Sequence, residues 1–149
     1  MFIVRLKFLF LIVCAAFCFS CQTTGYFIQD SNMPVSDTRK YVTALFGRPR
    51  ALSPNGRELF SNYHNNKFEL LEDSTNVGER FYTKVTILGP RRPYEIQVQV
   101  VQELYELESD AFVNMGVNED LSFRRAAVLQ KTLKEALTSS AVLEGEIPF

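Results

Sequence analysis

The chain has 149 residues, of which 46% are hydrophobic and 22% charged. This composition is typical of one globular domain and excludes a chain that is disordered throughout. Arg5 and Lys7 are the only charged residues among the first 20, so the rest of the chain has 14 basic and 17 acidic residues. Such a balance lacks the basic footprint of nucleic-acid-binding domains, and no nucleic-acid partner is expected.

The first 20 residues have the parts of a secretory signal peptide. Arg5 and Lys7 form a basic head, residues 8–19 are uncharged and mostly apolar, and the small Ser20 precedes Cys21. A transmembrane helix needs about 20 apolar residues, which this run does not reach. A buried core helix is the other alternative, and the N-terminal position and flanking charges disfavour it. We therefore expect residues 1–20 to be a signal peptide.

The four residues Cys18–Cys21 read CFSC and resemble the lipobox of bacterial lipoproteins, with Cys18 where Leu is usual and Phe19 before the small Ser20. The resemblance implies that Cys21 receives the lipid (palmitate among its acyl chains) and that the protein is anchored in the cell envelope. Gln22, rather than Asp, implies the outer membrane. Ordinary signal peptidase would also cut before Cys21, but would leave one unpaired cysteine in an oxidising compartment.

The segment after the lipobox is polar. Residues 21–34 are interrupted by Gly25 and Pro34 and are expected to form a tether, although residues 26–28 are also compatible with a first edge strand. A single domain over 35–149 would then follow. Its first helix is predicted over about 36–46, because Ser36 or Asp37 can cap its start and Gly47 can end it.

Strands are expected in the middle of the chain. Two short candidates lie at 58–63 and 67–72. Two longer segments, 81–88 and 94–104, alternate apolar and polar residues, a period typical of half-buried antiparallel strands. The turn residues Gly89, Pro90 and Pro93 lie between them, which predicts a long β-hairpin over about 80–105.

A second amphipathic helix is predicted over about 120–138, after a polar loop at 108–120. Its apolar face comprises Phe123, Ala126, Leu129, Leu133, Ala136 and Leu137, and its polar face comprises Arg124, Arg125, Lys131, Lys134 and Glu135. This order of elements predicts an α+β two-layer sandwich. An antiparallel sheet of about four strands would have both helices on one face.

Chemical signals are sparse. His64 is the only histidine and lies in a polar stretch, where an exposed turn is expected. As an alternative, His64, Tyr63 and a carboxylate would form an unfamiliar site of an envelope hydrolase or transferase. No metal or other cofactor is expected, because zinc prefers His and Cys ligands and the acidic clusters lack the spacing of a calcium loop.

Arg91 and Arg92 are the candidate contacts for a ligand or partner. They lie at the predicted tip of the hairpin, and planar guanidinium groups suit phosphates and carboxylates. A solvated turn is the alternative interpretation. Arg124 and Arg125 would join them only if the fold brought the start of the second helix near this tip.

Together these features predict a non-enzymatic, lipid-anchored binding or assembly module. Its partner would be an envelope protein or a glycolipid, contacted through edge strands or the row Gln97, Gln99 and Gln102. The element order resembles, in architecture alone, small lipoproteins that help to assemble outer-membrane machines. An enzyme near His64, or a structural surface lipoprotein without a specific ligand, are the alternatives.

Overall fold

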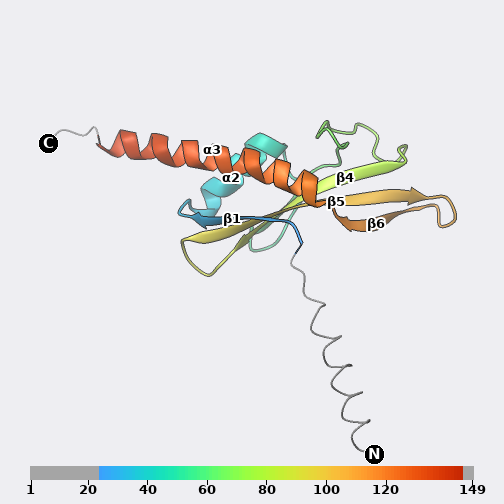
Figure 1. Ribbon diagram of the computed structural model, residues 1–149, viewed down its shortest axis with the longest axis horizontal. Coiled ribbons are helices and arrows are strands. Elements are labelled where there is room, and N and C mark those ends of the chain that lie inside the picture. Colours follow the sequence, from blue (N-terminus) through green and yellow to red (C-terminus); the bar gives the residue numbers. More distant parts are fainter. Residues whose placement is uncertain (1–23, 146–149) are drawn as a thin grey trace, which may run out of the picture.

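The computed structural model describes residues 24–145, and side chains up to residue 139. The expected signal peptide and Cys21 lie outside these residues. The described chain forms an antiparallel sheet and two helices (Figure 1). In chain order the elements are β1 (Tyr26–Ser31), α2 (Val35–Phe46), β2 (Ala51–Leu52), β3 (Glu58–Phe60), β4 (Glu79–Leu88), β5 (Tyr94–Glu106), β6 (Ala111–Val117) and α3 (Glu119–Gly145).

The sheet is built around β5, its longest strand. The strand order is β1–β5–β4–β3–β2, and β6 also pairs with β5. Since β4 pairs with β5 from Glu95 to Leu104, β1 and β6 share the opposite edge. β1 pairs with the first half of β5, starting with Tyr26 against Val98, and β6 pairs with the second half, ending with Val117 against Val101.

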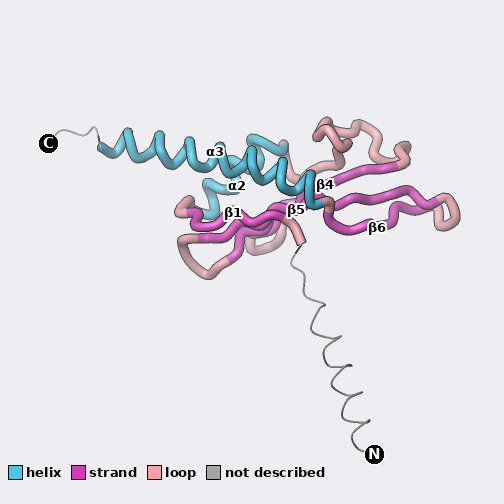
Figure 2. The backbone as a smooth tube through the Cα atoms, in the orientation of Figure 1, coloured by secondary structure: helices cyan, strands magenta, loops and turns pink. Residues whose placement is uncertain are grey.

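The predicted hairpin and both helices are confirmed, as is the α+β class. Along β4 the buried residues are Phe81, Thr83, Val85 and Ile87, which is the alternation expected when one face of a strand is packed. Both helices contribute to the main core, which contains Val42, Phe46, Ala126, Leu129 and Leu133 together with Ile28, Leu59, Val85, Ile96 and Val98. The helices therefore lie on one face of the sheet, and we call the opposite side the helix-free face (Figure 2).

Within residues 24–145 the sheet has six strands rather than about four. Residues 26–31 of the expected tether form β1, which favours the edge-strand alternative and starts the domain earlier than residue 35. β6 forms within the expected loop at 108–120. It is an edge strand with most side chains exposed, so its sequence carries little of the apolar alternation by which half-buried strands are recognised.

The predicted strand at 67–72 is wrong. The side chain of Asn65 replaces strand pairing with a local turn, because its Oδ1 accepts hydrogen bonds from the backbone N–H groups of Lys67 (2.9 Å) and Glu69 (3.0 Å). Asn side chains compete with regular structure in this way. Phe68 also has a positive φ of 68°, which is incompatible with a strand.

Candidate functional site

Arg91 and Arg92 lie at the β4–β5 turn, as predicted, and both are exposed. The turn is held to its neighbours by arginines: Arg92 donates to the carbonyl of Asn32 (3.4 Å), and Arg57 donates to the carbonyl of Gly89. The start of α3 lies elsewhere, because the N–H of Asn118 bonds the carbonyl of Val100 in the middle of β5. Arg124 and Arg125 consequently do not join the turn.

His64 is not an exposed turn residue. Its side chain is completely buried (0% exposed), stacked on Phe81 with ring centroids 6.3 Å apart and tilted against Phe68 at 5.3 Å. The exposed-turn expectation was therefore wrong. The residue forms isolated bridges with Phe81 and Leu70, so a long-range pairing with β4 turns the ring into the interior.

Both ring nitrogens of His64 have partners. Nδ1 lies 2.8 Å from the carbonyl oxygen of Asn65, which only accepts, so Nδ1 carries the proton. Nε2 then accepts a hydrogen bond from the Thr83 hydroxyl at 3.1 Å, and Arg125 Nε donates to that hydroxyl oxygen at 3.4 Å. The pKa of His64 is lowered to about 4, chiefly by burial; the bond to Asn65 opposes this shift, and the positive charge of Arg125 adds to it. His64 is neutral at physiological pH.

The His64–Thr83 pair has the atoms of a base and a hydroxyl nucleophile, but it is closed to solvent. Thr83 is only 1% exposed. Tyr63, the other residue of the hypothetical hydrolase site, lies on the helix-free face, where its ring contacts Tyr82 at 6.1 Å. The hydrogen bonds of the His64 ring go to a carbonyl and a hydroxyl rather than to a carboxylate. The structure does not bring these residues together around an open pocket.

Arg125 also departs from its expected place on the polar face of the second helix. Its guanidinium carbon lies 4.4 Å from the ring centre of Phe46 and 4.2 Å from that of Phe68, a cation–π arrangement. Burial lowers its pKa to about 10. The aliphatic part of an arginine side chain can pack at the edge of a core while the guanidinium contacts aromatic rings and a hydroxyl. Helical periodicity in the sequence does not predict such a buried position for an arginine.

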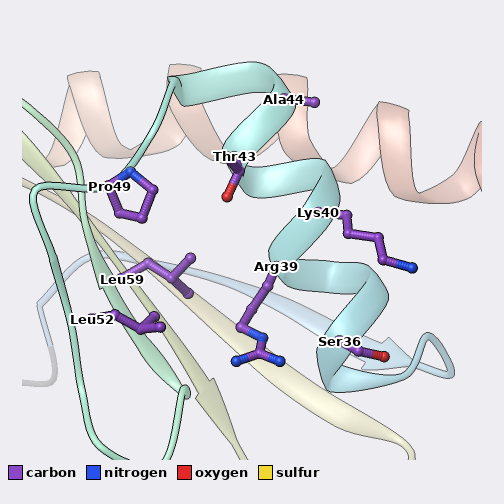
Figure 3. A pocket seen from close by; sticks show the side chains of 8 residues that line it. All are labelled: Ser36, Arg39, Lys40, Thr43, Ala44, Pro49, Leu52 and Leu59. Atoms are coloured by element: carbon purple, nitrogen blue, oxygen red, sulfur yellow. The ribbon is translucent and has the colours of Figure 1, made fainter.

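An open depression lies between α2 and the β2–β3 edge, and we call it the α2 groove (Figure 3). Its volume is about 590 Å³, within the range of small-molecule sites. Pro49, Leu52 and Leu59 lie on one side, and α2 supplies Ser36, Arg39, Lys40, Thr43 and Ala44. Of these, Arg39 extends toward the leucines in Figure 3. Leu52 is 48% exposed, which is unusual for a leucine next to a core.

Two cations of α2 line the same groove. Arg39 reaches across to the β2–β3 turn, where its guanidinium contacts Gly56. Lys40 is paired with Asp37 at 2.9 Å, but the lysine is 78% exposed, so this pair is weakly held. Arg39 and Lys40 are a partial signal of this groove in the sequence, since two consecutive cations interrupt the apolar pattern of an amphipathic helix. The sequence did not predict that leucines would lie opposite these cations in the groove, because β2 has only two residues.

No protein-family model, no curated protein and no solved structure matches this chain. Within residues 24–145, no helix is both long and apolar enough to cross a bilayer. In the same part of the chain, no three His, Cys, Asp or Glu side chains gather closely enough to hold a metal ion.

Proposed function

We propose that this protein is a lipid-anchored cell-envelope lipoprotein that acts as a non-enzymatic binding module. Its lipid is attached to Cys21, the membrane is the outer membrane, and the ligand is a phosphorylated glycolipid whose acyl chain enters the α2 groove. One observation supports the binding role: a single groove has an exposed apolar side and is also lined by two cations, Arg39 and Lys40.

The chemistry of the groove favours an anionic amphiphile over a purely polar ligand. Leu52 and Pro49 offer apolar surface that gains free energy when it is covered, roughly 25 cal/mol per Å², whereas Leu59 is already buried in the core beneath them. Arg39 is placed to donate two hydrogen bonds to a phosphate while the apolar side holds the chain attached to it. Arg91 and Arg92, at a different turn, are not part of this groove.

Binding through the groove predicts a loss of affinity in an Arg39→Gln variant. A charge-assisted hydrogen bond contributes about 1.5–3 kcal/mol, so the dissociation constant should rise roughly tenfold or more. The measurement is fluorescence anisotropy of fluorophore-labelled lipid A added to the purified full-length protein. Leu52→Asp should weaken binding similarly, because it places a charge on the apolar side.

The matched control is Lys131→Gln, a cation on the exposed side of α3 (78% exposed). Lys131→Gln should bind the probe as the unchanged protein does. If Arg39→Gln and Lys131→Gln weaken binding equally, attraction by overall charge explains the result and the groove is not the site.

The lipid anchor gives a separate prediction. Replacing Cys21 with Ala should abolish incorporation of radiolabelled palmitate and release the protein from membranes, because no other thiol follows the signal peptide. Cell fractionation and gel autoradiography measure both effects. A Cys18→Ala variant should keep its label. Palmitate incorporation into Cys21→Ala would show that the anchor has been assigned to the wrong residue.

A further inference from the structure

The helix-free face of the sheet carries an aromatic surface with cations set among the rings. Six half-buried rings lie on it: Phe27, Phe60, Tyr63, Tyr82, Tyr105 and Phe112. The guanidinium carbon of Arg50 lies 4.4 Å from the ring centre of Tyr63 and 4.7 Å from that of Tyr82. Arg80 lies 3.9 Å from Tyr63 and 3.5 Å from Phe112. Apart from Phe27, these rings and the two arginines form one connected network that draws on β3, β4, β5, β6 and two loops.

Arg50 is the cation of this face that stays available to an anion. Arg80 is paired with Glu103 at 2.7 Å and Lys84 with Glu58 at 2.8 Å. Arg50 instead donates to the Ser61 carbonyl and the Tyr63 hydroxyl. In the described part of the chain no carboxylate forms an ion pair with it. Aromatic rings beside an uncompensated arginine are the side chains that favour the headgroup region of a membrane.

The described chain enters the domain over this same face. The carbonyl of Thr24 accepts hydrogen bonds from Nε2 of Gln97 and of Gln99, both at 2.9 Å. Both glutamines alternate with the buried residues Ile96 and Val98, so their side chains lie on the helix-free face. Gly25 allows this close approach, because a Cβ there would lie 2.6 Å from Gln99 Cγ and its φ is +101°.

The proposed anchor is therefore short. Cys21 precedes Thr24 by three residues, and three residues span at most about 11 Å. A lipid on Cys21 would keep Thr24, which lies over the helix-free face, within this distance of the bilayer.

We propose that the helix-free face docks on the surface of an anionic phospholipid bilayer, with its rings at headgroup depth and Arg50 against lipid phosphates. This inference rests on the proposed anchor at Cys21. It assigns the orientation of the domain: the sheet contacts the membrane, and the groove beside α2 faces the aqueous side.

Two single-cysteine variants of the full-length lipidated protein test this orientation. Ala51→Cys lies in β2 beside Phe60, on the helix-free face, and Ala127→Cys lies on the solvent side of α3; both alanines are exposed. Each is labelled with a fluorophore after reconstitution into vesicles of phosphatidylethanolamine and phosphatidylglycerol that contain a headgroup nitroxide lipid. The label at 51 should be quenched at least threefold more strongly than the label at 127. Equal quenching, or stronger quenching at 127, would overturn the proposal.

Charge reversal supplies the second measurement. Arg50→Glu, added to Ala51→Cys, should reduce quenching to the level seen at 127, whereas Lys134→Glu, on the exposed side of α3, should leave it unchanged. Mass spectrometry of the same samples reports whether Cys21 carries lipid. If Cys21 carries no lipid and the protein does not float with the vesicles, both the proposed anchor and the proposed orientation are wrong. A lipidated protein with equal quenching would overturn the orientation alone.

Discussion

Stability should fall by about 1.5 kcal/mol between pH 6.5 and pH 5, because of His64. The pKa of this histidine is lowered by burial from 6.5 to about 4 in the folded protein. Between these values the unfolded chain binds a proton that the folded chain does not, so the free energy of unfolding decreases as the pH falls. The slope is about 1.4 kcal/mol per pH unit. Above about pH 7.5, where the unfolded histidine is also neutral, this residue should contribute almost no pH dependence.

The measurement is urea denaturation of the full-length protein in detergent at a series of pH values from 8 to 5, where ordinary exposed carboxyl groups remain ionised. The matched variant is His64→Gln, whose amide can still bond the Thr83 hydroxyl but does not titrate. It should be less stable at pH 8, yet lose most of the pH slope. A slope retained in His64→Gln would mean that another group is responsible.

Leu129→Ala should destabilise the domain by about 2–5 kcal/mol, the range for large-to-small changes at closed core sites. Leu129 is 0% exposed and lies in the core cluster that joins α3 to α2 and the sheet. In the part of the chain that the structure describes, both helices pack on one face of the sheet, so this cluster is their main attachment to it. Thermal or urea unfolding followed by circular dichroism gives the change in free energy.

Val128→Ala is the neighbouring control. Val128 is 51% exposed, and alanine favours helices at least as well as valine, so its effect should stay within about 0.5 kcal/mol. Two adjacent variants with similar losses would show that α3 does not pack through the face that contains Leu129.

Much of the fold could be predicted because its signals are local. The alternation in β4 and β5 and the apolar positions of α2 and α3 follow from the repeat of each element, and a strand or helix with one packed face imposes that repeat on its own sequence. Ala126, Leu129 and Leu133 are buried as predicted. Phe123 is 53% exposed; it lies near the start of α3, where its ring makes a T-shaped contact with Tyr26.

The candidate sites were less predictable, because contacts between distant segments create them. His64 and Thr83 are 19 residues apart, and Arg125 joins them from a third segment. The α2 groove forms where a helix faces a two-residue strand. Neither arrangement leaves a repeat or a motif in the sequence, so composition and spacing pointed instead to Arg91 and Arg92.

By itself, the sequence determined the α+β class, the long hairpin, the two helices and the expectation of a lipid on Cys21, since each depends on neighbouring residues. Only the tertiary structure decided that His64 is a buried neutral residue, that Arg125 is part of the interior, and that six aromatic rings share one sheet face with the chain entering at Thr24. The physical reason is that burial and proximity depend on which strands pair. Pairing is settled by contacts across the whole chain and not within any one segment.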